Sequence, residues 1–232
     1  MRQLFHHPLQ PQSRVIRLQL AEKRLEAEFV VERPWDRREQ FLRLNPAGEV
    51  PLLAEENGLV LCGFYPVLEY LEEAYPETAA GPSSTGTPLM GRNLQERGEI
   101  RRLIAWFDGK FEREVTKNLL TEKIFKRYMP NGGGPDSSAI RAGKSNIGIH
   151  LDYIGWLMER RTWLAGPVLS LADLVAAAQI SAIDYLGDVP WDEHEAAKDW
   201  YARMKSRPSF RPLLADSLPG APPPAHYANL DF

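Results

Sequence analysis

The sequence has a single cysteine, Cys62, among its 232 residues. One cysteine excludes an intramolecular disulfide, and the opening "MRQLFHHPLQ" lacks the apolar run of a secretory signal, so we expect a cytoplasmic protein. Long hydrophobic runs are lacking too. The most apolar stretch, "LSLADLVAAAQISAI", contains Asp173 and is shorter than the roughly 20 apolar residues that cross a bilayer. We therefore expect no membrane insertion.

The chain also lacks a large excess of either charge, because its formal net charge is only −3 and its pI is about 6.0. No overall field attracts a polyanion, so we expect no nucleic-acid partner. The five histidines show no metal-ligand spacing, and we expect each to be exposed or hydrogen-bonded, with no metal bound. The glycines 132–134 lack the Lys-Ser/Thr of a phosphate loop. Cys62 has no neighbouring cysteine or evident base, which favours a small buried side chain over a reactive thiol.

The first half of the chain mixes strand and helix signals. "RQLFH" and "EAEFVVE" have the character of strands, and "SRVIRLQLAEK" between them is an amphipathic helix with Ile16 and Leu20 one turn apart. These segments predict a βαβ unit. "DRREQFLRLNP" predicts a helix stopped at Pro46, "VPLLAEENGLVL" predicts two strands joined through Asn57-Gly58, and "YPVLEYLEEAYP" predicts a last helix.

The second half shows only helix signals. Apolar residues at spacings of three and four predict one long helix with a buried stripe, made of Ile100, Leu103, Ile104, Phe107, Phe111 and Val115. "MPNGGGPDSSAIRAGKS" predicts a mobile loop. Further helices are expected at about 147–161, 171–186 and 192–206. We therefore predict a first domain at 1–78, a linker rich in Pro, Gly, Ser and Thr at 79–90, a helical domain at 91–217 and a Pro-rich tail at 218–232.

This order of elements resembles the glutathione transferase superfamily, which implies a thioredoxin-like domain (α/β) followed by an all-α domain. "NPAGEVPLL" resembles the family's loop into the third strand, where the peptide bond before Pro51 would be cis and the Val50 backbone would pair with glutathione. "SLADL" resembles the capping box of the core helix, and Ser170 and Asp173 can form that box on physical grounds alone. "WYARMKSRPSF" resembles the closing helix.

The resemblance places an active site in the turn before the first helix, but the residues there are poor for catalysis. Many relatives use a Ser, Tyr or Cys to stabilise the glutathione thiolate, and the alignment puts Gln10 at that position. An amide neither ionises nor matches the geometry of a hydroxyl. Ser13 remains a weak candidate, for which capping of the helix is the favoured role. Arg14 and Arg17 are expected to be surface or interdomain charges.

The third helix of the first domain would hold the γ-glutamyl end of glutathione. Active relatives carry an acidic residue and a Ser there, and this chain has Gly63 and Phe64 instead. Loss of charge-assisted contacts, at about 1.5–3 kcal/mol each, predicts little or no glutathione binding. We therefore expect no cofactor, and vestigial binding positions at Val50, Pro51, Gly63 and Phe64.

The closing stretch from Leu169 to Phe232 resembles one branch of the superfamily, the FtsZ-binding division proteins of alphaproteobacteria. That resemblance implies a homodimeric, non-catalytic adaptor at the division site, which binds polymerised FtsZ and bundles or curves the filaments in cytokinesis. Three alternatives stay open: a glutathione S-transferase with an atypical active site, a transferase acting on another thiol, and an adaptor for an unrelated partner.

Three regions are candidate partner surfaces. The first is Trp35, a large aromatic among charges, which could equally shield the core of its own domain. The second is a set of cations around the Gly-rich loop, which could equally be ordinary solvated charges. The third is the tail, which could equally pack back on the helical domain. The cations are Lys123, Lys126, Arg127, Arg141 and Lys144, and the tail residues are Tyr227, Leu230, Asp231 and Phe232.

Overall fold

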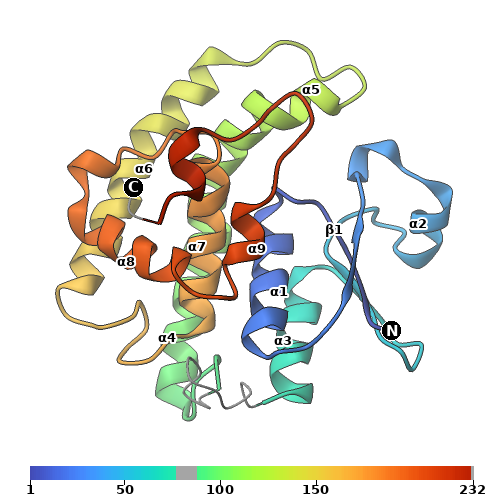
Figure 1. Cartoon of the computed structure of the whole chain (residues 1–232), viewed down its shortest axis with the longest axis horizontal. Coiled ribbons are helices and arrows are strands. Elements are labelled where there is room, and N and C mark those ends of the chain that lie inside the picture. Colours follow the sequence, from blue (N-terminus) through green and yellow to red (C-terminus); the bar gives the residue numbers. More distant parts are fainter. Residues whose placement is uncertain (77–87, 231–232) are drawn as a thin grey trace. The chain divides into compact units, whose positions relative to one another are not determined.

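The computed structural model describes residues 1–76 and 88–230 (Figure 1). The chain divides into two compact units, Met1–Leu89 and Met90–Phe232. Most of the expected linker, residues 79–87, lies outside the described residues. The two units are described separately below.

The N-terminal unit begins with the predicted βαβ arrangement. Strand β1 (Gln3–His6) is followed by helix α1 (Pro11–Glu22) and strand β2 (Glu28–Val31), and β1 and β2 pair in parallel. Helix α1 starts at a proline, which suits the first turn of a helix because its missing N–H would have no partner there. Ile16 and Leu20 are both buried, as their spacing predicts.

A four-stranded sheet of order β2-β1-β3-β4 forms the centre of this unit. Strands β3 (Leu52–Ala54) and β4 (Val60–Cys62) are antiparallel, and Gly58 in the turn between them has φ +88°. The turn is also held by the Leu59 N–H, which donates to Asn57 Oδ1 at 3.0 Å. The predicted Asn-Gly hairpin is therefore present.

Helices cover both faces of the sheet. Helices α1 and α3 (Phe64–Ala74) lie on one face, while the short helix α2 (Glu39–Leu44) lies on the other, where Phe41 packs 5.7 Å from the ring of Phe5 (Figure 1). A single 3₁₀ turn, η1 (Pro34–Asp36), precedes α2. Helix α2 ends before Pro46, as expected.

The C-terminal unit starts with one long helical run. Helix α4 (Leu94–Ile104) continues into a π-helical segment, η2 (Ala105–Phe125), and then into α5 (Lys126–Tyr128). The predicted stripe is buried at every position. The buried residues within η2 include Phe107, Phe111, Val115 and Leu119, which recur every four residues, a wider period than the 3.6 residues of an α-helix.

The predicted mobile loop is shorter than expected, because its second half is helical. Helix α6 runs from Ser137 to Met158, and the Asp136 carboxylate caps it by accepting from the Ser138 N–H at 2.7 Å. Gly143 lies inside this helix, where an added Cβ would be 2.8 Å from Leu119 Cγ. The glycine therefore allows close packing of α6 on η2 and does not mark a loop.

Helix α7 (Leu171–Asp184) is the core of the C-terminal unit, and each of its residues is buried. It lies among the other helices of that unit in Figure 1. The chain continues through η3 (Trp191–Glu193), α8 (Glu195–Lys205) and α9 (Arg211–Leu214). A last 3₁₀ turn, η4, covers Ala225–Ala228. Within the described ranges, no helix combines the length and apolar character that crossing a bilayer requires.

Candidate functional site

The turn between β1 and α1 holds Gln10 and Ser13, the two vestigial candidates. Gln10 is half-buried, and its side-chain amide donates to Gln12 Oε1 at 3.2 Å without capping the helix. Ser13 is fully buried, and its Oγ accepts from the His7 N–H at 3.3 Å. The expected capping role of Ser13 is therefore wrong. Because α1 starts at Pro11, Ser13 lies inside the first turn of the helix. Its hydroxyl accepts a hydrogen bond from the turn that precedes the helix.

Two arginines of α1 are buried, so a surface position, one of the two alternatives expected for them, is wrong. Arg14 Nε donates to the Pro8 carbonyl at 2.7 Å, and the Arg17 guanidinium lies 5.6 Å from the centre of the Phe29 ring. Burial, with these two cations, lowers the pKa of His6 to about 3. His6 Nδ1 is buried without a hydrogen-bond partner, so the expectation that each histidine is exposed or hydrogen-bonded is wrong for His6. This imidazole is neutral at physiological pH.

The other half of the vestigial site lies where β3 and α3 begin. The Val50-Pro51 peptide bond is cis, as the resemblance implies, and the Gly63 N–H donates to the Pro51 carbonyl at 3.0 Å. Gly63 has φ +90°, which favours glycine, and precedes α3. Phe64 opens the helix, its ring 5.0 Å from that of Tyr65, and the first turn contains no acidic residue. Positions 63 and 64 therefore carry neither a carboxylate nor a hydroxyl, and the Phe64 ring is buried.

Cys62 is half-buried beside the core of the same unit. Its Sγ lies 3.5 Å from the Leu44 carbonyl oxygen, and burial raises the pKa of the thiol. A raised pKa reduces the thiolate fraction at neutral pH, which is unfavourable for a nucleophile. The described part of the chain contains no group of three or more His, Cys, Asp or Glu side chains placed to share a metal ion.

Trp35 lies in η1 and is half-buried. Its ring makes an edge contact with His7, with 5.2 Å between the ring centres. Part of the indole therefore packs against its own unit while part stays accessible.

Two of the predicted cations, Lys123 and Lys144, meet at Asp188, whose side chain is nearly buried. Lys123 Nζ lies 2.8 Å and Lys144 Nζ 2.9 Å from Asp188 Oδ1. Lys126 pairs with Glu122 at 2.6 Å, so three of the five predicted cations are in ion pairs. The remaining two, Arg127 and Arg141, are exposed. We call these five residues the basic cluster.

The C-terminal tail is packed on the C-terminal unit. Tyr227 is fully buried, and its hydroxyl donates to the Leu213 carbonyl at 2.9 Å. Leu230 is half-buried, and Asp231 and Phe232 lie outside the described residues. The tail thus packs back, one of the two alternatives that the sequence left open.

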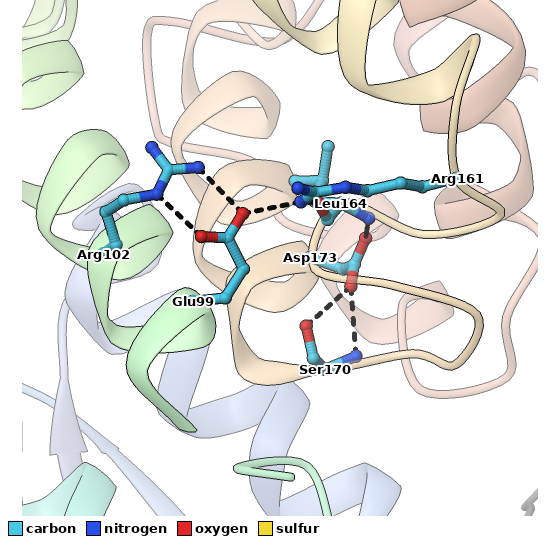
Figure 2. Close-up of polar contacts among 6 residues, drawn as sticks. All are labelled: Glu99, Arg102, Arg161, Leu164, Ser170 and Asp173. Atoms are coloured by element: carbon cyan, nitrogen blue, oxygen red, sulfur yellow. Dashed lines mark hydrogen bonds and ion pairs between the residues drawn. The ribbon is translucent and has the colours of Figure 1, made fainter. Parts of the chain in front are cut away.

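A polar network joins α4, the loop between α6 and α7, and the first turn of α7 (Figure 2). Asp173 accepts from the backbone N–H groups of Leu164 at 2.8 Å and Ser170 at 3.0 Å, which includes the predicted capping box. Arg161 donates to the Leu164 carbonyl at 2.7 Å and to Glu99 at 2.6 Å. Hydrogen bonds from Arg102 and Arg161 lower the pKa of Glu99 to about 2. The carboxylates of Glu99 and Asp173 both accept hydrogen bonds within the protein, so the network has a structural role.

Glu112 is a titratable residue that the sequence analysis missed. Its Oε2 is buried without a hydrogen-bond partner, and burial, with the nearby charge of Asp108, raises its pKa to about 7. Gln179 of α7 hydrogen-bonds to the carboxyl group. A single glutamate in the middle of a helix forms no motif, so only the tertiary structure identifies it.

Comparison with known proteins agrees with this fold. Residues 11–74 match the family model of the glutathione S-transferase N-terminal domain. The structure is similar to that of a glutathione S-transferase from Rhodospirillum rubrum F11, with a TM-score of 0.93, 53% identity and full coverage of both chains. The fold and these matches thus define a protein of the glutathione S-transferase superfamily.

Two further matches identify one family within this superfamily. The chain is 48% identical to FtsZ-localized protein A of Caulobacter vibrioides, over 100% of this chain and 98% of that protein. The solved structure of FzlA from C. crescentus matches with a TM-score of 0.91 and 48% identity, covering 100% of this chain and 99% of that one. The chain belongs to the family of FtsZ-localized protein A.

Proposed function

We propose that this protein is a non-catalytic adaptor that binds polymerised FtsZ as a homodimer. It acts in the cytoplasm at the division site, where it bundles or curves filaments during bacterial cytokinesis. The observation that carries the proposal is the 48% identity, over the whole chain, to a relative named for its localisation with FtsZ.

The vestigial site supports a role without catalysis. Gln10 stands where relatives place a hydroxyl, and Ser13 uses its Oγ to accept from a backbone N–H. Gly63 and Phe64 offer neither a carboxylate nor a hydroxyl to the γ-glutamyl group. Because each missing charge-assisted bond costs about 1.5–3 kcal/mol, we propose that glutathione is not a cofactor of this chain.

A face of α6 supports the homodimer. Ile149, Tyr153 and Trp156 follow one another at spacings of four and three, and Ile149 and Trp156 are 60% and 49% exposed. Tyr153 stacks 6.1 Å from Trp156 and 4.6 Å from Trp106, which extends the apolar surface onto η2. We call these four residues the α6 aromatic stripe. Exposed Ile149 and Trp156, joined by the half-buried rings of Tyr153 and Trp106, form a contiguous apolar surface of a kind typical of interfaces.

The ends of the stripe suit pairing with a second copy. Arg160 lies over the Trp156 ring and pairs with Glu159 at one end, and Lys110 lies over the Trp106 ring and pairs with Glu114 at the other. Each end therefore carries one cation and one carboxylate. A two-fold axis can place opposite charges of the two copies against each other. A dimer of this kind presents each filament-binding surface twice, so binding at the second surface becomes effectively intramolecular.

Three surfaces remain candidates for the filament contact. Trp35 is accessible on one side, and Arg127 and Arg141 of the basic cluster are exposed. The tail ends in Leu230, Asp231 and Phe232, beyond the buried anchor Tyr227. The two exposed arginines are the part of the basic cluster best suited to an acidic partner, because the three lysines are already in ion pairs.

Sedimentation of the protein with purified FtsZ, with and without GTP, tests the proposal. We expect GTP-dependent recovery in the polymer pellet at physiological salt, and recovery only in the supernatant contradicts the adaptor role. Reversing the exposed charges with R127E/R141E should weaken pelleting if the basic cluster is the contact. The matched control R43E/R92E reverses two exposed arginines outside it.

A second candidate is a glutathione S-transferase with an atypical active site. It is favoured by the 53% identity to the Rhodospirillum rubrum protein, which carries the name of the enzyme. It predicts retention on a glutathione matrix and conjugation of an electrophilic substrate. Turnover that disappears in Ser13→Ala would establish it and remove the non-catalytic proposal. A transferase for another thiol predicts turnover without glutathione, and an adaptor for an unrelated partner predicts neither turnover nor pelleting.

A further inference from the structure

The C-terminal segment Leu218–Ala228, which we call the strap, is attached to the C-terminal unit at several points. Near its start, the Leu218 N–H donates to the Tyr185 hydroxyl at 2.8 Å, and that hydroxyl donates to the Ala221 carbonyl at 2.6 Å. Near its end, the buried Tyr227 ring makes an edge contact with Tyr185, with 5.3 Å between the ring centres. The strap therefore has an apolar anchor and specific polar contacts.

Beneath the strap lies a buried pair of opposite charges. Asp184, at the end of α7, and Lys205, at the end of α8, are both 0% exposed, and Lys205 Nζ lies 3.8 Å from Asp184 Oδ2. Trp191 Nε1 donates to Asp184 Oδ1 at 3.0 Å. Burial raises the pKa of Asp184 and lowers the pKa of Lys205, so each group is held in surroundings that disfavour its charge.

The strap contacts both members of this pair. His226 Nε2 lies 3.4 Å from Asp184 Oδ1, and the His226 carbonyl accepts from Lys205 Nζ at 3.4 Å. His226 also lines a pocket of ≈ 290 Å³ together with Val189, Pro190, Trp191, Asp192, Glu193 and Lys198. One residue of the strap thus contacts two buried charges and forms part of a pocket wall.

These contacts have opposing effects on the attachment of the strap. Burial of the Tyr227 ring favours the attached state. Removal of water from Asp184 and Lys205 disfavours it, because the desolvation of a buried ion pair can exceed its Coulombic gain, and at 3.8 Å this pair lacks a direct hydrogen bond. Lifting the strap would return water to both charges.

We propose that the strap is a displaceable element that exchanges between a docked and a lifted state. The docked state holds the last turn, η4 (Ala225–Ala228), in one place for its partner. This second statement rests on the proposed binding of filaments, whereas the exchange itself is a property of the isolated protein.

Two variants should shift the exchange in opposite directions. Tyr227→Ala removes the apolar anchor, and we expect amide hydrogen exchange in 218–228 to become about tenfold faster or more. The double variant D184L/K205M replaces the ion pair by apolar side chains, and we expect exchange there to slow about tenfold, because such replacements often stabilise. Leu94→Ala, at an exposed leucine of α4, is the control that should leave exchange in the strap unchanged.

The outcomes separate the strap from the adaptor role. Unchanged exchange in Tyr227→Ala, or faster exchange in a folded D184L/K205M, overturns the proposal. If the double variant does not fold, His226→Asn takes its place and should speed exchange several-fold, with unchanged exchange counting against the proposal. In the FtsZ sedimentation assay, Tyr227→Ala should pellet less and D184L/K205M more than the unaltered protein. Failure of the unaltered protein to pellet contradicts the adaptor role but leaves the exchange results standing.

Discussion

At the scale of one residue, Glu112 shows how buried surroundings raise the pKa of a side chain. The ordinary pKa of a glutamate is about 4.3, and burial raises that of Glu112 to about 7. The neighbouring charge of Asp108 acts in the same direction, while the hydrogen bond from Gln179 opposes both. The folded protein therefore holds this proton at pH values where the unfolded chain has released it.

Glu112 should make the free energy of unfolding depend on pH. Because the native state binds the extra proton, the contribution of Glu112 to the free energy of unfolding falls as pH rises from the ordinary glutamate pKa to about 7, by at most about 4 kcal/mol, and is level above. Glu112→Gln should remove this fall. Urea unfolding at pH 5 and pH 8 measures the difference, with the exposed Glu159→Gln as control. An equal fall in Glu112→Gln and in the unaltered protein would contradict the assignment.

Single residues were also where prediction from the sequence was least accurate. The cis peptide bond before Pro51 was expected from the family resemblance, whereas α1 was predicted to start at Ser13 and starts at Pro11. The role of Ser13 could not be predicted, since a hydroxyl can serve the helix or the preceding turn, and the His7 N–H decides between them. The burial of His6 likewise depends on residues distant in sequence.

At the scale of elements, the periodic segments were predicted well and the boundaries less so. The buried stripe from Ile100 to Val115 follows directly from apolar spacing. The first turns of α6 were missed because "GGGPDSSAIRAG" is rich in residues that interrupt helices, while the cap at Asp136 and the packing of Gly143 on Leu119 become clear only in three dimensions. The start of α6 is therefore set by the cap at Asp136 and not by the composition of the segment.

The start of α7 should be the polar arrangement most sensitive to substitution. Asp173→Ala would leave three buried N–H donors without their acceptor, those of Leu164, Ser170 and the Trp200 indole, and would also remove the acceptor of the Ser170 hydroxyl. At about 1–3 kcal/mol for each unpaired donor, the free energy of unfolding should fall by at least about 3 kcal/mol. Thermal or urea unfolding measures it.

Two matched variants test the cause of that loss. Asp173→Asn keeps one acceptor oxygen and should cost less than Asp173→Ala. Ser170→Ala removes only the capping hydroxyl and should cost about 1 kcal/mol. If all three substitutions had the same effect, the hydrogen bonds of Asp173 would not be the source of the stability.

At the scale of the whole molecule, the proposed adaptor depends on association of two copies. The α6 aromatic stripe predicts which substitution prevents it. Trp156→Glu places a charge within the stripe and should weaken the dimer at least about tenfold, because charges are disfavoured at the centre of an interface. Sedimentation velocity over a range of concentrations measures the change.

The control for this variant is Leu94→Glu, which adds the same charge at an exposed leucine outside the stripe. A monomeric Trp156→Glu variant should still pellet with FtsZ polymer but should no longer bundle filaments, since it carries only one copy of each surface. If the Trp156→Glu protein remained dimeric, the dimer interface would have to lie on another face.

The close contact of α6 with η2 has a consequence for the evolution of this family. An added Cβ at residue 143 would meet the Leu119 side chain at 2.8 Å, so any larger residue there requires a compensating change. Homologous sequences should therefore covary at these two positions: a glycine at 143 should accompany a bulky residue at 119, and an alanine or serine at 143 a smaller one.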